Sequence, residues 1–239
     1  MLDHCIARVW KKKGGIAGTA FLVTEKHLLT CAHVVNFVFG KEKNHTDKPT
    51  DSFEVDFPFL GKSKIRVKVR KDLWYPLPLE PSSQSDIAVL EVQNELPLGC
   101  CAGNFAKANN FSGHIIRAFG FPANTGSEGR WLQAETLGPV TNRWIQAEAR
   151  TELTGEQIRQ GFSGAPVWSD SLGAIVGMIT AYDTDSAQKR IGFFIPADLL
   201  LDALCDLKSY CILKSKAVTP PLAPKYLEYH LNYEKQWAA

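Results

Sequence analysis

Short apolar runs separated by turn-forming residues recur along most of the chain. Runs of this length, with glycine, proline or asparagine between them, are typical of β-strands. We expect strands at residues 4–10, 19–23, 27–30, 52–57, 65–69, 87–92, 115–119, 131–137, 144–149, 167–168, 174–180 and 192–195. So many short strands with so few helices predict an all-β barrel or sandwich.

Two segments have helical spacing instead. Residues 32–37 predict one short helical turn. A longer helix is predicted over residues 197–208, because Pro196 suits a helix start and the following apolar residues share one face. Those residues are Leu199, Leu200, Ala203, Leu204 and Leu207. We expect this face to pack against the strands that precede the helix.

The composition changes near residue 212. Residues 215–224 contain three prolines and predict a linker, and residues 226–237 are rich in aromatic and charged side chains. We therefore divide the chain into one domain at 1–212 and a linker and tail at 213–239, and the linker-like composition suggests that a further domain follows. The pattern leaves open whether the tail docks on the domain or extends away from it.

Charge and hydropathy exclude two classes of partner. The net charge is only +2, whereas a nucleic-acid-binding domain is normally strongly basic. The densest basic run, residues 11–13, is interpreted as a solvated turn. No run of 18 apolar residues exists, so no membrane-spanning helix is predicted, and the first twenty residues lack the apolar core of a secretory signal.

Six cysteines are present, without a CxxC or a Cys/His metal pattern. The adjacent Cys100 and Cys101 are poorly placed to pair with each other. This usage favours reduced thiols, and with no signal segment it predicts a cytoplasmic location. Neither a metal nor a cofactor is predicted.

Three segments carry the residue types that a nucleophilic serine requires. A serine hydroxyl needs a base within hydrogen-bonding reach, a carboxylate that orients the base, and N–H donors for the developing oxyanion. His33 follows an apolar strand, Asp86 comes directly before another, and Ser163 lies between two glycines, Gly161 and Gly164. Each residue alone has an ordinary structural explanation, but together they predict a catalytic triad.

The segments GTAFLVTEKHLLTCAHVV, SDIAVLEV, GFSGAPVWSDSLGAIVGMITAYD and IGFFIPADLL resemble, in this order, the chymotrypsin-like (trypsin-like) serine peptidases. The resemblance is closest to the bacterial HtrA-type branch and covers roughly residues 4–208. It implies two six-stranded Greek-key β-barrels, at about 1–100 and 101–196, followed by the helix. The chain also resembles the trypsin-like modules of multidomain bacterial signalling or defence proteins, which implies a regulatory domain or partner.

The resemblance assigns a role to each residue of the triad. It implies a serine endopeptidase in which Ser163 attacks the peptide carbonyl, His33 transfers the proton and Asp86 holds the His33 ring. The N–H groups of Gly161 and Ser163 would form the oxyanion hole. The substrate would be a protein or peptide, which would lie along residues 180–182.

The resemblance also implies where the substrate binds. The candidate substrate-binding residues are Gln157, Ile158, Thr180, Ala181, Tyr182, Gly192 and Phe193. Glu156 is an alternative that would select lysine or arginine, so the residue preference stays open.

Two departures from the family pattern lie near Ser163. Phe162 stands where the secreted digestive enzymes carry an aspartate that pairs with a newly cut N-terminus, so we expect no activation by N-terminal cleavage. Ala165 replaces a glycine.

The alternative function is a catalytically silent or latent pseudoprotease that binds peptides in the same groove. A cysteine-based enzyme is disfavoured, because Cys31 is better explained by packing near His33.

Overall fold

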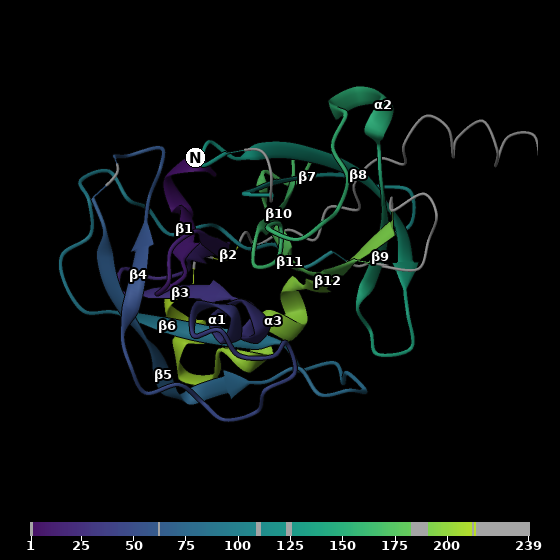
Figure 1. The fold of residues 1–239 in the computed structure, drawn as a ribbon. Helices are drawn as coiled ribbons and strands as arrows, with labels where there is room; N and C mark the ends of the chain where they lie inside the picture. Colours follow the sequence, from purple (N-terminus) through teal and green to yellow (C-terminus); the bar gives the residue numbers. More distant parts are fainter. Residues whose placement is uncertain are drawn as a thin grey trace, which may run out of the picture.

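The computed structural model describes residues 2–61, 63–108, 111–122, 126–182, 191–211 and 213. These residues form two closed six-stranded antiparallel β-barrels with a few short helices (Figure 1). The predicted all-β, two-barrel architecture is thereby confirmed. The predicted linker and tail lie outside the described residues, except for Leu213.

The first barrel has the strand order β1-β2-β3-β6-β5-β4, and β1 pairs with β4 to close it. A 3-10 turn, Asp3–Cys5, precedes it, and helix α1, Ala32–Val38, follows β3. Its strands are β1 Ile6–Trp10, β2 Ile16–Leu22, β3 His27–Thr30, β4 Phe53–Asp56, β5 Ile65–Tyr75 and β6 Ile87–Val92.

The second barrel has the order β10-β11-β12-β9-β8-β7, and β10 pairs with β7. A four-residue helix, α2, spans Thr151–Thr154 and was not anticipated. The strands are β7 Ile115–Gly120, β8 Arg130–Pro139, β9 Ile145–Ala149, β10 Pro166–Ser169, β11 Ala174–Tyr182 and β12 Ile191–Pro196.

The hydrophobic pattern of each strand explains its place. On β5, Ile65, Val67 and Val69 are buried while the alternating Arg66 and Lys68 are exposed, as expected for a strand with one solvated face. On β6, residues 87–90 are all buried, because β6 pairs with β3 and β5 and joins the main apolar cluster on both faces. Strand β6 therefore fixes the residue that precedes it, Asp86.

The helix predicted at 197–208 is shorter than expected. Helix α3 spans Ala197–Ala203, and a 3-10 segment, Cys205–Tyr210, follows it. Cys205 has φ +49°, which ends the α-helical geometry. The Tyr75 hydroxyl donates a hydrogen bond to the carbonyl of Ala203 at 3.0 Å. Tertiary contacts with β5 thus override the regular leucine spacing. None of the described helices is long and apolar enough to cross a lipid bilayer.

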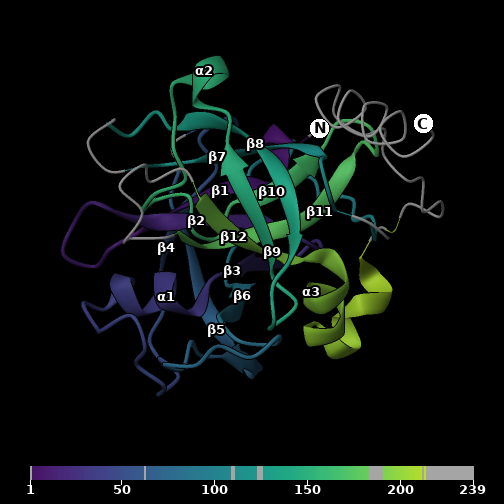
Figure 2. The same cartoon turned by 90° about the vertical axis from the view of Figure 1, so that its right-hand side faces the viewer.

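The predicted leucine face of α3 is buried, and it connects the barrels. Leu199, Leu200 and Leu204 belong to the same apolar cluster as the strands of the first barrel, while α3 also packs against β11 and β12. Figure 2 shows α3 beside the first barrel at the end of β12. The helix therefore contributes to holding the two barrels together, at whose junction the candidate site lies.

Candidate active site

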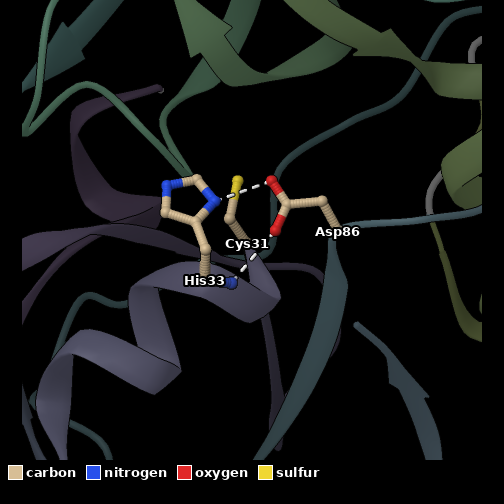
Figure 3. Close-up of side chains that lie close together, drawn as sticks. All are labelled: Cys31, His33 and Asp86. Atoms are coloured by element: carbon tan, nitrogen blue, oxygen red, sulfur yellow. Dashed lines mark hydrogen bonds and ion pairs between the residues drawn. The ribbon is translucent and has the colours of Figure 1, made fainter. Parts of the chain in front are cut away.

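His33 and Asp86 come together because β3 pairs with β6. The register places Thr30 opposite Ala88, so that the start of α1 faces the residue before β6. His33 Nδ1 lies 2.7 Å from Asp86 Oδ2, and the His33 backbone N–H donates to Asp86 Oδ1 at 3.0 Å (Figure 3). One carboxylate oxygen of Asp86 therefore holds the His33 ring, and the other holds the His33 backbone.

Asp86 is fully buried and carries a third hydrogen bond, from the Thr180 hydroxyl. Burial acts to raise the pKa of the Asp86 carboxyl, but the facing His33 ring and the hydrogen bonds from His33 and Thr180 outweigh it and hold this pKa below its usual value. Asp86 also has φ +63°, an uncommon left-handed conformation for a non-glycine residue. The carboxylate is therefore ionised at neutral pH and tightly held.

Ser163 lies between a strand of each barrel. On one side its carbonyl accepts a hydrogen bond from the Thr19 N–H of β2 at 3.0 Å. On the other side the Gly164 N–H donates to Ile179 of β11 at 2.8 Å. A Cβ at Gly164 would lie 1.9 Å from the Thr19 carbonyl oxygen, so only glycine fits after the serine.

The Ser163 hydroxyl donates to the Thr180 carbonyl at 3.3 Å. Within the described part of the chain, no hydrogen bond joins Ser163 to His33. Thr180 connects the three predicted triad residues instead, since its hydroxyl reaches Asp86 and its carbonyl reaches Ser163.

This position of Thr180 was missed by sequence reasoning, which considered only its backbone. The register of β11 against β12 shifts between Ile179 and Ala181, and the shift falls at Thr180. Its buried hydroxyl, at the end of an apolar strand, was the available signal.

Gly161 occupies a tight turn that only glycine can make. Its φ is +105°, and the Phe162 N–H donates to the Arg159 carbonyl at 3.1 Å, which together are typical of a type II turn. The Gly161 carbonyl accepts from the Phe121 N–H at 3.1 Å and from Thr19 Oγ1 at 3.0 Å. A Cβ at this residue would lie 2.1 Å from the Phe121 carbonyl oxygen.

The backbone N–H groups of Gly161 and Ser163 are available as donors. Neither donates a hydrogen bond to any other described residue. Both residues are buried, and buried N–H groups without an acceptor are rare in proteins. A type I turn would rotate the peptide between Gln160 and Gly161 by roughly half a turn. The observed turn therefore fixes the direction of the Gly161 N–H.

Phe162 anchors this turn through its side chain. The ring is fully buried in the apolar cluster of the second barrel, and a Cβ at Gly120 would lie 2.7 Å from its Cδ1 atom. Phe162 N–H and C=O are also both bonded, to Arg159 and Ala165. Hydrophobic burial therefore holds the turn without any ion pair at Phe162.

Several of the candidate substrate-binding residues lie at the beginning of β12. Strand β11 pairs Ala181 with Phe193 and Tyr182 with Gly192. The buried Ile158 lies against Gly192, where an added Cβ would meet its Cγ2 atom at 2.4 Å. Ile158 therefore occupies space next to β12.

The neighbouring polar residues differ in their surroundings. Gln157 is half-buried. Glu156, the alternative selector of basic side chains, is already bonded to Arg159 at 2.8 Å.

Cys31 lies beside the histidine and the carboxylate. Its Sγ, the His33 ring and Asp86 are mutually within 4.8 Å, a group that has the donors of a metal site (Figure 3). Burial, and then the Asp86 charge, raise the pKa of the Cys31 thiol well above its usual value, and the thiol donates to the Ile179 carbonyl at 3.2 Å. A protonated thiol is a poor metal ligand and nucleophile, which argues against a cysteine-based enzyme.

Comparisons with known proteins bear on the family and the fold of the chain. Residues 18–178 match the family described as the trypsin-like peptidase domain. No curated protein gives a match to the sequence. Solved structures do match, and three of them are 17%, 19% and 18% identical to this chain, so their likeness shows the fold alone.

Three of these structures are serine proteases or forms of one. Rv3671c from M. tuberculosis, as a serine-to-alanine mutant in an inactive form, has a TM-score of 0.61 at 17% identity, covering 87% of this chain and 88% of that chain. The active form of the same protein has a TM-score of 0.59 at 18% identity, covering 92% of this chain and 87% of that chain. The serine endoprotease from Yersinia pestis has 0.59 at 19%, covering 87% of this chain and 64% of its own.

Proposed function

The chain belongs to the trypsin-like peptidase domain family, and from this premise we propose that it is a serine endopeptidase that acts through a Ser163 acyl-enzyme. The observation that carries the proposal is the buried bond between His33 Nδ1 and Asp86, linked through Thr180 to Ser163. A positioned base, an ionised carboxylate and an adjacent hydroxyl are the parts that acyl transfer needs.

His33 serves as the base and then as the acid. Because Asp86 accepts from Nδ1, the other ring nitrogen, Nε2, is left to take the Ser163 proton as Oγ attacks the peptide carbonyl. The same proton then passes to the leaving amine, and water releases the acyl group by the reverse sequence. Asp86 stays ionised and stabilises the imidazolium that forms.

The Ser163 hydroxyl must turn from the Thr180 carbonyl toward His33 before attack. The hydrogen bond that it gives up has a net value of about 0.5–1.5 kcal/mol, so the rotation is inexpensive. Catalytic hydrogen bonds in proteins without substrate are often absent or long. The observed position is therefore compatible with an enzyme awaiting substrate.

The N–H groups of Gly161 and Ser163 form the oxyanion hole in this proposal. Their lack of any acceptor among the described residues, together with the type II turn at Gly161, supports the assignment. One such donor contributes about 10²–10³ in kcat in a serine protease. The acyl half of the substrate is assigned to residues 180–182, as an added strand beside β11.

The second candidate is a latent or catalytically silent protease that binds peptides. The bond of the Ser163 hydroxyl to Thr180 rather than to His33 favours it. An inactive and an active form of Rv3671c match with TM-scores of 0.61 and 0.59, so the fold does not separate the two states. The open donors at Gly161 and Ser163 support the active enzyme.

A fluorophosphonate probe, which reacts only with an activated serine, tests the proposal. We expect Ser163 to be labelled in the wild-type protein, labelling to be lost in Ser163→Ala, and a mixed peptide library to be cut only by the wild type. A folded wild-type protein that neither labels nor cleaves contradicts the proposal. Peptide binding without cleavage in that sample would support the silent candidate.

We further propose that the domain works inside the cell, as the protease of a larger bacterial signalling or defence system. The support is the resemblance to such modules and the free thiols of Cys5, Cys31, Cys100, Cys205 and Cys211. Fractionation of the source cell with thiol alkylation tests this location. Recovery outside the cytoplasm, or with oxidised cysteines, would contradict it.

A further inference from the structure

We propose that a basic cleft beside Gly161 receives the substrate residues that follow the scissile bond, and that Lys11, Lys13 and Lys41 select acidic side chains there. The inference rests on the proposed function, because it uses the position of the scissile bond at Ser163. It adds a substrate class, namely peptides with aspartate or glutamate just after the cleavage site.

The position of Ser163 between two strands determines the side. Thr180 of β11 accepts a hydrogen bond from Ser163 on one side, and Thr19 of β2 donates one to Ser163 on the other. On the β2 side, a Cβ at Gly18 would lie 3.0 Å from the Ser163 carbonyl oxygen. If the acyl half of the substrate lies along β11, the residues after the scissile bond of an extended substrate pass the beginning of β2. Each residue advances such a chain by about 3.3 Å.

Two adjoining clefts lie at the beginning of β2. The first has a volume of about 440 Å³ and includes Gly161, Gln160, Ile16, Ala17, Phe121 and Lys11 in its wall. The second, of about 280 Å³, is lined by Lys11, Lys13, Lys41, Gln160 and Val38 among others. Lys11 and Gln160 belong to both walls. The lysines therefore begin next to the proposed oxyanion hole and continue away from it.

The hairpin between β1 and β2 is firmly built. The Lys11 N–H donates to Gly15 at 2.9 Å, and the Gly14 N–H donates to Lys11 at 3.1 Å. The Lys12 N–H donates to the Val38 carbonyl at 3.1 Å, which ties the hairpin to the end of α1. The hairpin backbone therefore holds Lys11 and Lys13 beside the clefts before substrate arrives.

The middle lysine of this run has a different role. Lys12 forms an ion pair with Asp51 at 2.8 Å, and its ammonium lies 4.7 Å from the centre of the Phe39 ring. It faces neither cleft. In contrast, none of Lys11, Lys13 and Lys41 forms an ion pair within the described ranges of the chain.

Acidic residues do occur nearby, but none of the described ones lines either cleft. Glu54 of β4 lines a neighbouring cleft that Lys11 also borders, but it is paired there with Lys64 at 2.7 Å. Glu42 and Glu128 are exposed; the first follows Lys41 in the chain, and the second accepts a hydrogen bond from Ser127.

The buried Arg8 and Asp56 neutralise each other, with 2.7 Å between them. The clefts therefore have a positive potential, which attracts a carboxylate and repels an ammonium group.

Paired peptides test the inference. A peptide library first supplies a cleavable sequence, and three versions then carry glutamate, glutamine or lysine at the second and third positions after the cut. For the wild-type protein we expect kcat/KM to be at least about tenfold higher with glutamate than with lysine at low ionic strength. The ratio should fall to within about threefold near 1 M salt, where the Debye length is about 3 Å.

Two charge-reversed variants give the matched comparison. Lys11→Glu with Lys13→Glu and Lys41→Glu should invert the glutamate-to-lysine ratio. The control, Lys26→Glu with Lys71→Glu and Lys107→Glu, changes exposed lysines outside both clefts by the same total charge and should keep the wild-type ratio. Because the readout is a ratio within each protein, a general loss of rate cancels.

Each outcome bears on a different claim. Cleavage with no glutamate preference, or with the same preference after cleft reversal, overturns the cleft and leaves the peptidase standing. If the control variant loses the preference as well, net charge rather than the cleft is responsible, and the inference also fails. If the wild-type protein does not cut any library peptide or label with fluorophosphonate, the proposed function itself fails.

Discussion

The two halves of the candidate site are held in different ways. In the first barrel, side chains do the holding, since Asp86 accepts hydrogen bonds from the His33 ring, the His33 backbone and Thr180. In the second barrel, a backbone turn at Gly161 does it, and the buried apolar ring of Phe162 anchors that turn. The base half is thus fixed by charge, whereas the nucleophile half depends on the state of one turn.

This difference suggests where control can act. A buried, triply bonded carboxylate has no inexpensive alternative position. The peptide before Gly161 could adopt two orientations, corresponding to type I and type II turns, and only one orientation is expected to aim its N–H at the oxyanion. We therefore expect changes at Asp86 to disturb the chemistry without disturbing the turn at Gly161, and changes around Phe162 to disturb the turn as well as the stability.

The largest effect is expected from breaking the base half. Asp86→Asn removes the charge and offers the wrong partner to His33 Nδ1, so kcat should fall by about 10⁴. Steady-state kinetics on a library-derived peptide measures this loss. The turn at Gly161 should be unaffected in a crystal structure of the variant. A loss of tenfold or less in kcat would correspond to only about 1.4 kcal/mol of activation free energy. So small a loss would mean that Asp86 does not orient the base.

Phe162 tests the anchor of the nucleophile half. Phe162→Ala should lower the free energy of unfolding by about 3–5 kcal/mol, because a fully buried ring is removed. Activity should fall as well, since the turn loses its anchor. Phe162→Leu, which keeps most of the apolar volume, is the control and should cost less than about 1.5 kcal/mol. Urea unfolding gives the free energy of unfolding of both variants. Equal stability of the two variants would contradict the role of Phe162 as the anchor of the turn.

Gly161→Ala tests the turn itself. A side chain there would meet the Phe121 carbonyl, so the turn must change and kcat should fall by about 10²–10³. Gly155→Ala is the matched control, because Gly155 also has positive φ but an added Cβ there would have no neighbour within 4 Å. Kinetics of the two variants separates turn geometry from strain. Similar losses in both would contradict a special role for Gly161.

Thr180 joins the halves and gives the smallest effect. Thr180→Val keeps the shape but removes the donor to Asp86, at a cost of about 1.5–3 kcal/mol for a hydrogen bond to a charged group. Because the pKa of Asp86 is lowered in the folded protein, its contribution to stability is present above pH 3.8 and is lost as pH falls further. In the variant the Asp86 pKa should rise, so acid unfolding should begin at higher pH. An unchanged acid transition, followed by circular dichroism, would contradict this.

The pattern of short strands was sufficient for an all-β barrel or sandwich, and the family resemblance supplied the two barrels. Alternating side chains in strands such as β5 and the polar interruptions between strands are local features. The register that brings Thr30 opposite Ala88 is not local, so the His33–Asp86 distance had to come from the structure. The resemblance supplied the roles of these residues in advance.

Other features depend on contacts between distant segments. The break at Cys205 follows from Tyr75 reaching the end of α3, which no helical pattern contains. The bulge that turns Thr180 toward Asp86 likewise depends on the register between β11 and β12. The basic run at residues 11–13 was interpreted as a solvated turn, and the structure confirms an exposed turn between β1 and β2. That Lys11 and Lys13 also line clefts beside Gln160 depends on contacts with distant segments.

The most direct test of the triad and its turn is a crystal structure with a peptide boronic acid bound. We predict a covalent bond from boron to Ser163 Oγ, with one boronate oxygen about 2.7–3.1 Å from the N–H groups of Gly161 and Ser163. His33 should lie within hydrogen-bonding distance of the adduct while keeping its bond to Asp86. A boronic acid that leaves Ser163 unmodified, or an adduct whose oxygens avoid both N–H groups, would contradict the account.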